Sequence, residues 1–357
     1  MKMVFRWYGE KDTIPLNFIK QIPGVVGIVG ALFDVPVGEV WPFDKIMKLK
    51  QRVENEGLKL EVIESVNVHE DIKLGLPSRE KYIDNYIKTI KNLSQAGVKV
   101  VTYNFMPIFD WLRTNLNKPL EDGSTTMEYD HSLIEDINPN QLIENVKKGT
   151  QGFILPGWEW DRLEKLEKTF EMYKNIDEQK LFENLVYFLE RVIPYCEKYD
   201  IKLAIHPDDP PWKIFGLPRI ITNKENIEKM LKAVDSKYNG LALCMGSLGA
   251  NPNNDLPGMV RHFGEMGRIH FAHVRNLKIT GKKKFHETAH PTFCGTHDMY
   301  EIMKAFYEIG FEGYIRPDHG RMIWNEKGTP GYGLYDRALG AVYLQGLWEA
   351  ISKRCEN

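Results

Sequence analysis

Eight short apolar segments recur along the chain, and their number and spacing limit the fold more than any other feature of the sequence. Their centres fall near residues 5, 27, 63, 100, 204, 242, 271 and 314, mostly about 30 to 40 residues apart. Amphipathic stretches separate several of them; in residues 79–95, for example, Ile83, Tyr86 and Ile90 share one helical face. Eight strands alternating with helices predict a parallel α/β structure, and eight is the strand number of a (β/α)8 TIM barrel. A doubly wound open sheet is the alternative, but its usual glycine-rich phosphate loop after the first strand is missing here.

The interval between the fourth and fifth segments is much longer than the others. Residues 104–179 account for it, with turn-forming residues around 115–124 and helical stretches expected near 141–148 and 162–174. We therefore predict one TIM-barrel domain over residues 1–357, in which residues 104–179 form an insertion of loops and helices that caps the C-terminal face of the barrel. The tryptophans of this insertion either form its core or wall a substrate pocket. They are Trp111, Trp158 and Trp160.

The composition is typical of a folded protein with a sizeable buried core. Hydrophobic residues make up 43% of the chain and charged residues 27%, and the formal net charge is −2. This balance argues against a general nucleic-acid or membrane-surface role, and the sequence contains no apolar run long enough to span a membrane. Four cysteines in so long a chain do not indicate a disulfide framework, and the first residues lack the apolar stretch of a signal peptide. We therefore expect a cytoplasmic protein.

Potential metal ligands end four successive strand candidates. His206, Cys244, His273 and Asp318 each follow or close an apolar segment, and the C-terminal strand ends of a barrel meet at one face. Two imidazoles, a thiolate and a carboxylate suit iron(II), manganese or zinc better than magnesium or calcium. Cys244 taken alone is typical of a small buried apolar residue. The prediction of a metal site therefore rests on the joint placement of the four residues.

Over essentially its whole length the sequence resembles the mannonate dehydratases of bacterial hexuronate breakdown. The matching stretches include residues 3–9 (MVFRWYG), 102–107 (TYNFMP), 285–290 (FHETAH) and 316–320 (RPDHG). This resemblance implies a TIM barrel of the xylose-isomerase-like kind that uses a Mn²⁺ or Fe²⁺ ion. It also implies the conversion of D-mannonate to 2-keto-3-deoxy-D-gluconate and water.

Such a dehydration needs a base for the proton next to the carboxylate and an acid for the departing hydroxyl. We assign proton transfer to His319, turned toward the substrate by residues 317–320, and we expect Tyr332 to act as the acid; Asp318 counts both as a ligand and as a catalytic residue. There are two alternatives: His319 only hydrogen-bonds a loop carbonyl, and the arginines only form structural ion pairs. The candidates for substrate binding are Arg6, Asn104, Arg275, Asn276 and Arg316.

Three other functions fit parts of this pattern. A metal-dependent sugar isomerase or epimerase on the same barrel is the closest, although such enzymes favour carboxylate-rich metal sites and Cys244 counts against them. A metal-dependent nuclease would need more acidic ligands and a basic face for phosphates. A non-catalytic sugar-acid binding protein is the third. For the dehydratase we expect a small sugar acid as partner, no nucleic acid and no membrane, with a homodimer left open.

Overall fold

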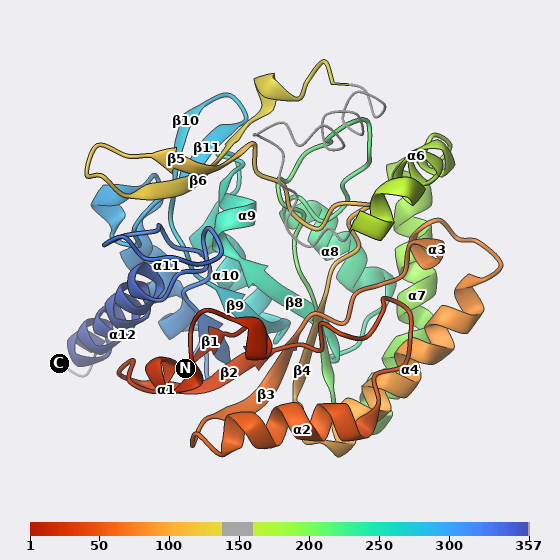
Figure 1. The fold of residues 1–357 in the computed structure, drawn as a ribbon, viewed down its shortest axis with the longest axis horizontal. Helices are drawn as coiled ribbons and strands as arrows, with labels where there is room; N and C mark the ends of the chain where they lie inside the picture. The colour runs from red at the N-terminus through yellow and green to blue at the C-terminus, as the bar shows by residue number, and fades with distance from the viewer. Residues whose placement is uncertain (138–159, 356–357) are drawn as a thin grey trace.

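The computed structural model describes residues 1–137 and 160–355, and eight parallel strands form a closed barrel at its centre (Figure 1). Around the barrel the order is β1-β12-β9-β8-β7-β4-β3-β2, so the TIM barrel expected from the eight segments is confirmed. Its strands are β1 (Lys2–Arg6), β2 (Val25–Gly30), β3 (Lys59–Glu64), β4 (Val100–Tyr103), β7 (Lys202–Ile205), β8 (Asn239–Cys244), β9 (Ile269–His273) and β12 (Tyr314–Arg316).

Two layers of side chains fill the inside of the barrel. The lower layer is apolar and takes one residue from each strand: Val4, Val29, Val62, Val100, Ala204, Ala242, Phe271 and Tyr314. Strand side chains alternate between the two faces, so the residue two positions further along also points inward, one layer higher. At seven of these eight positions the sequence has Arg6, Glu64, Thr102, His206, Cys244, His273 and Arg316, and at the eighth, beyond β2, it has Ala31. The pleat of the strands therefore sets polar residues above an apolar floor.

Helices cover the outside of the barrel and bury their apolar faces against it (Figure 1). The helix expected at residues 79–95 is α4 (Arg79–Gln95). Side chains cap several helix starts; Asn223, for example, accepts a hydrogen bond from the Asn226 amide. The other outer helices are α2 (Phe43–Glu54), α7 (Glu178–Tyr199), α8 (Lys224–Ala233), α10 (Leu256–Glu265), α11 (Met299–Glu308) and α12 (Tyr335–Cys355), and the short ones are α1 (Leu16–Ile19), α3 (Glu70–Lys73) and α9 (Met245–Gly249).

The inserted segment contains strands, which the sequence interpretation of loops and helices missed. Its β5 (Asn115–Pro119) and β6 (Thr125–Asp130) join β11 (Lys284–Glu287) and β10 (Leu277–Gly281) in an antiparallel sheet of order β10-β11-β6-β5. β5 is half exposed and polar, so its strand state depends on pairing with β6 and not on a local apolar pattern. The stretch expected to be helical near 162–174 is α6 (Trp160–Tyr173), whereas the helix expected at 141–148, like Trp158, lies outside the described residues.

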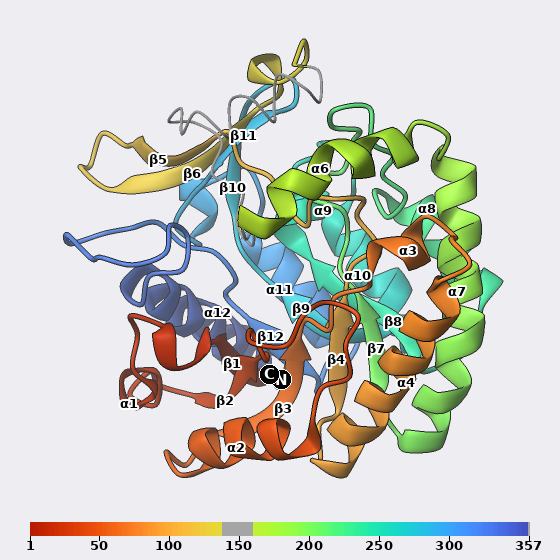
Figure 2. The ribbon, with the colours of Figure 1, turned by 45° about the vertical axis from the view of Figure 1, so that its right-hand side comes forward.

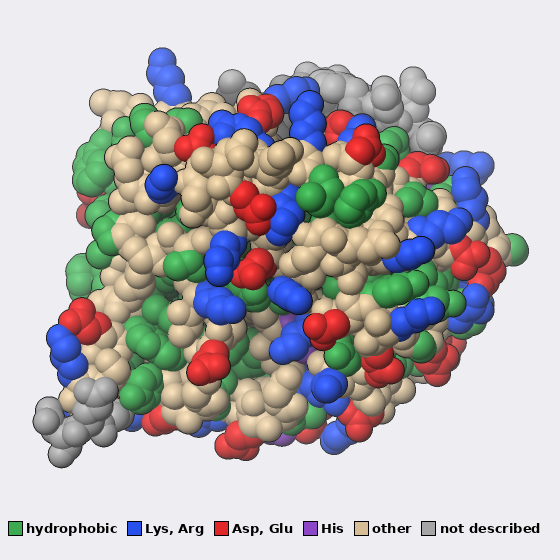
Figure 3. Space-filling view, turned by 90° about the horizontal axis from the view of Figure 1, so that it is seen from below, with side chains coloured by type: hydrophobic (Ala, Val, Ile, Leu, Met, Phe, Trp, Pro, Cys, Tyr) green, Lys and Arg blue, Asp and Glu red, His purple; other side chains and the backbone are tan. Residues whose placement is uncertain are grey.

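The small sheet and α6 lie at the same end of the barrel (Figures 1 and 2). A β-bridge joins Trp111 to Asp209, just beyond the end of β7, so this is the end at which the barrel strands terminate. Lysine, arginine and acidic side chains are interspersed over the face seen in Figure 3. Among the described helices, none is both long and apolar enough to cross a membrane.

Candidate active site

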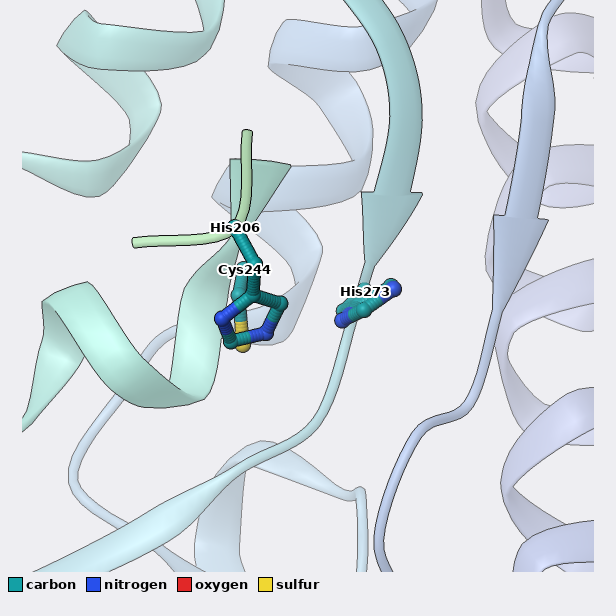
Figure 4. Close-up of side chains that lie close together, drawn as sticks. All are labelled: His206, Cys244 and His273. Carbon is teal, nitrogen blue, oxygen red and sulfur yellow. The ribbon is translucent and has the colours of Figure 1, made fainter. Parts of the chain in front are cut away.

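The predicted metal ligands lie together at the barrel mouth. Ligand atoms of His206, Cys244 and His273 are all within 4.8 Å of one another, and Figure 4 shows the side chains of His206 and Cys244 close together, with His273 beside them on the neighbouring strand. The carboxylate of Asp318 adjoins this group: its Oδ2 is 3.6 Å from Cys244 Sγ and its Oδ1 4.0 Å from His273 Nδ1. The fold thus brings the four ligand candidates into one site.

The chemical state of these side chains suits a metal ion. His206 Nδ1 lies 2.7 Å from the carbonyl oxygen of Pro207; a proton on Nδ1 donates this bond and leaves Nε2 as a free ligand. His273 Nε2 and Asp318 Oδ1 are buried and make no hydrogen bond within the described chain. Each has a charged neighbour that lacks hydrogen-bond geometry: Glu64 Oε1 lies 3.2 Å from His273 Nε2, and Arg316 Nη2 lies 2.7 Å from Asp318 Oδ1. Imidazole, thiol and carboxylate donors together fit a transition metal.

The turn after β12 turns Asp318 into the site. Asp318 has φ 62°, a left-handed conformation that non-glycine residues seldom adopt. The strand therefore ends here, and the side chains of Asp318 and His319 point to different neighbours. Arg275 Nε lies 2.6 Å from Asp318 Oδ2, and Arg316 Nη2 is close to the other oxygen. Burial alone would raise the pKa of Asp318, but the charge that His319 has when it is protonated and the charges of Arg316 and Arg275 hold it well below its usual value. Asp318 is therefore an ionised ligand candidate.

His319 and Tyr332 form a hydrogen-bonded pair beside the ligand group. The Tyr332 hydroxyl is 2.7 Å from His319 Nε2, and Glu287 Oε1 is 3.0 Å from His319 Nδ1. Trp111 packs against the pair, with its ring centroid 5.4 Å from that of His319. Burial lowers the pKa of His319 and raises the pKa of Tyr332 well above its usual value. The imidazole is thus neutral and the phenol protonated at neutral pH, the states that a base and an acid require.

The candidates for substrate binding divide into two groups. Arg275 donates to three buried carboxylates, those of Asp318, Glu287 and Asp209. The Asn276 side chain bonds the backbone of the loop at residues 290–297. Both side chains thus already have partners within the protein, and their contact with the substrate stays a prediction.

Arg316, Arg6 and Asn104 stay at the barrel mouth, and each is buried. Arg316 Nε and Nη1 have no hydrogen-bond partner among the described residues. Arg6 donates through Nη1 to the carbonyl oxygens of Trp7 and Val29, and Asn104 Oδ1 accepts from the Met106 amide. Of these three residues, Arg316 is therefore the one whose buried donors lack a partner among the described residues.

Sequence reasoning missed two carboxylates of the site. Glu64 closes β3, faces His273 and Arg316, and has an Oε2 without a hydrogen-bond partner among the described residues. Its position at a strand end was a signal that the sequence did offer. Glu287, in the 285–290 motif, contacts His319, Arg113 and Arg275. Its partners lie far away in the chain, so no local pattern pointed to them.

Fold and site together define a class, the TIM barrels with a side-chain group suited to a metal ion at the C-terminal strand ends. Among solved structures, D-psicose 3-epimerase with D-tagatose from Clostridium cellulolyticum H10 has a TM-score of 0.54 and 15% identity, covering 99% of this chain and 97% of that one. Identity this low supports the fold alone. Within the class, a family model described as D-mannonate dehydratase (UxuA) matches residues 1–357. The chain belongs to the D-mannonate dehydratase family and is an enzyme of that family.

Individual relatives agree with this assignment. The mannonate dehydratase of Thermotoga maritima is 76% identical over 354 residues, which cover 99% of this chain and 98% of the relative. That of Geobacillus thermodenitrificans is 57% identical, with 98% and 95% covered. The crystal structure of mannonate dehydratase from Streptococcus suis serotype 2 superimposes with a TM-score of 0.90 at 45% identity, covering 100% of this chain and 95% of that one. The family expected from the motifs is therefore confirmed.

Proposed function

We propose that this enzyme dehydrates D-mannonate to 2-keto-3-deoxy-D-gluconate, with His206, Cys244, His273 and Asp318 holding a Mn²⁺ or Fe²⁺ ion. The observation that carries the proposal is the His319–Tyr332 pair, joined at 2.7 Å next to a buried group of ligand-type side chains. When bound, a divalent ion supplies Lewis-acid stabilisation of the negative charge that develops beside the substrate carboxylate. The protein's own side chains carry out the remaining steps.

His319 is the base and Tyr332 the acid in this reaction. His319 Nε2 takes the proton from C2, and the electrons of that C–H bond form the C2=C3 double bond as the C3–O bond breaks. Tyr332 gives its proton to the departing hydroxyl, which leaves as water, and the enol product converts to the 2-keto acid. The direct hydrogen bond between the two side chains then lets His319 return a proton to the tyrosinate, so both groups regain their starting states.

Arg316 binds the substrate carboxylate in this proposal, because its buried Nε and Nη1 have donors without partners in the described chain. Glu64, 3.2 Å from Arg316 Nη2, keeps the guanidinium in place. In this proposal the described parts of the inserted segment, residues 104–137 and 160–179, help to exclude water from the site. In support of this, Trp111 packs on His319, and Arg113 pairs with Asp209 and Glu287 at the barrel mouth.

His319→Asn and Tyr332→Phe test the proposal. With D-mannonate and Mn²⁺, the unmodified enzyme should form a 2-keto-3-deoxy acid, and each variant should lose about 10²- to 10⁴-fold in kcat, the usual contribution of an acid or base. Both variants should retain bound metal by elemental analysis, since neither residue is a proposed ligand. Near-normal turnover of His319→Asn would remove His319 from the mechanism, and lost metal would make it a ligand. Absence of the keto acid with the unmodified enzyme would refute the function itself.

A further inference from the structure

Glu287 reaches the catalytic pair from outside the barrel sheet. It is the last residue of β11, its side chain is 1% exposed, and one of its carboxylate oxygens lies 3.0 Å from His319 Nδ1. We propose that Glu287 is a positioning residue that fixes the tautomer and orientation of His319, so that Nε2 faces Tyr332 and the substrate without a proton. This inference rests on the proposed role of His319 and adds a residue that sets its state.

The geometry around the imidazole permits one neutral tautomer. An ionised carboxylate only accepts hydrogen bonds, so the bond between His319 Nδ1 and Glu287 Oε1 requires the proton to be on Nδ1. In a neutral ring the lone pair is then on Nε2, 2.7 Å from the Tyr332 hydroxyl, which donates to it. Both ring nitrogens are thereby assigned, and the ring plane is held from two sides.

The carboxylate of Glu287 is itself held in place and kept charged. Arg113 Nη2 lies 2.7 Å from Oε1, the oxygen that also contacts His319, and Arg275 Nη1 donates to Oε2. Burial would raise the pKa of Glu287, but the charges of Arg275 and Arg113 hold it below its usual value. Glu287 therefore has the two properties that a positioning carboxylate needs, a fixed location and a permanent negative charge.

The small sheet explains how Glu287 arrives at this place. Glu287 pairs with Leu277 of β10 in an antiparallel register, and the Thr126 hydroxyl of β6 donates to the Glu287 carbonyl oxygen. The segment after β4 supplies β6 and the segment after β9 supplies β10, and these two strands fix the backbone on both sides of Glu287. A site residue carried on a paired strand is held more firmly than one on a loop.

Asp209 provides a matched control, because Glu287 also serves as a counter-ion for two buried arginines. The Asp209 carboxylate accepts from Arg113 Nη1 at 2.7 Å and from Arg275 Nη2 at 3.0 Å, the same two arginines. Its other side-chain contact in the described chain is the Ser247 hydroxyl, and it makes no contact with His319. Loss of either charge weakens the same arginine network, but only the loss of Glu287 releases His319.

The test compares Glu287→Gln with Asp209→Asn in the Mn²⁺-loaded enzyme. The single amide oxygen of glutamine cannot take both positions, so its NH2 group must face either Arg275 or Arg113 and His319. Glu287→Gln should therefore lower kcat for D-mannonate by about 10²- to 10⁴-fold, with KM within about threefold. Asp209→Asn should lose less than about tenfold in kcat. In the His319→Asn background, Glu287→Gln should cost less than about threefold more, since both changes remove the same function.

A second readout does not depend on turnover. Nitrogen NMR of [¹⁵N]histidine-labelled enzyme, loaded with diamagnetic Zn²⁺, should show His319 protonated on Nδ1 in the unmodified protein and in Asp209→Asn, but not in Glu287→Gln. If the glutamine variant does not fold, Glu287→Asp takes its place. It keeps the charge but withdraws the carboxylate by one carbon, and it should show the same loss of kcat and of the Nδ1 proton signal.

Three results would overturn the positioning role. These are equal kcat losses in Glu287→Gln and Asp209→Asn, an undiminished effect of Glu287→Gln in the His319→Asn background, and an unchanged His319 tautomer in Glu287→Gln. If His319→Asn itself retains turnover, the proposed function fails at His319 and takes this inference with it. If His319→Asn is inactive while Glu287→Gln stays active, only the inference about Glu287 fails.

Discussion

Replacement of Arg316 by lysine tests where the substrate carboxylate binds. The Arg316 side chain is 4% exposed, and its Nη2 faces Glu64 at 3.2 Å and Asp318 at 2.7 Å. Its Nε and Nη1 make no hydrogen bond with any described residue. A buried donor without a partner costs about 1–3 kcal/mol, so we expect these groups to be satisfied by the bound sugar acid.

The expected effect follows from what lysine keeps and what it loses. An ammonium preserves the positive charge beside Glu64 and Asp318, but it has one nitrogen and lacks the planar array of guanidinium donors. A hydrogen bond to a charged acceptor contributes about 1.5–3 kcal/mol. Loss of one such bond to the carboxylate should therefore lower kcat/KM for D-mannonate by about 10- to 150-fold.

Steady-state kinetics with D-mannonate, combined with inhibition by D-mannitol, isolates the carboxylate. Mannitol has the same six-carbon chain without the acid group, so its inhibition constant should stay within about threefold of the parent value in Arg316→Lys. Arg6→Lys is the control, because Arg6 Nη1 already donates to two backbone carbonyls. It should have a smaller effect on mannonate.

Three results would refute this reasoning about Arg316. If kcat/KM for D-mannonate in Arg316→Lys stays within about threefold of the parent, the two unpaired donors do not bind the acid. If mannitol inhibition weakens as much as mannonate turnover, the variant has disturbed the site in general. A larger loss in Arg6→Lys than in Arg316→Lys would move the carboxylate to Arg6.

Two further predictions concern metal content and stability. Cys244→Ala should reduce metal affinity about 10- to 100-fold. The control is Cys196→Ala, which removes a buried thiol from α7 and should retain the metal. Both are measured by elemental analysis after dialysis, and full metal occupancy in Cys244→Ala would exclude Cys244 as a ligand. Burial lowers the pKa of His297 to about 4, whereas it is ~6.5 in the unfolded chain. Between these two values only the unfolded chain takes up the proton. The free energy of unfolding should therefore fall by about 2 kcal/mol as the pH drops from 6.5 to 5. The free energy of unfolding, measured with urea at pH 7 and pH 5, should fall less in His297→Gln than in the parent protein, by that amount. Equal losses in both proteins would contradict the lowered pKa of His297.

Local patterns in the sequence were enough to predict the barrel and that the ligand candidates would lie together at one face. Short apolar runs mark the barrel strands, which are buried along most of their length, and parallel strands in a closed barrel must end at the same face. Residues such as His206, Cys244 and His273 therefore converge once the strand ends are identified, whatever the connecting segments do. Asp318 and His319 follow the last strand directly and were found for the same reason.

Only the tertiary structure decided how the remaining polar residues are used. Arg275 and Arg316 look alike in sequence, each at the end of a strand, yet three carboxylates surround Arg275, while Nε and Nη1 of Arg316 have no partner in the part of the chain that the structure describes. The strand β5 and the contact of Glu287 with His319 likewise depend on partners far away in the chain. Local periodicity reports which face of an element is buried, whereas the partner of a buried charge is set by the packing of distant segments, on which that periodicity carries no information.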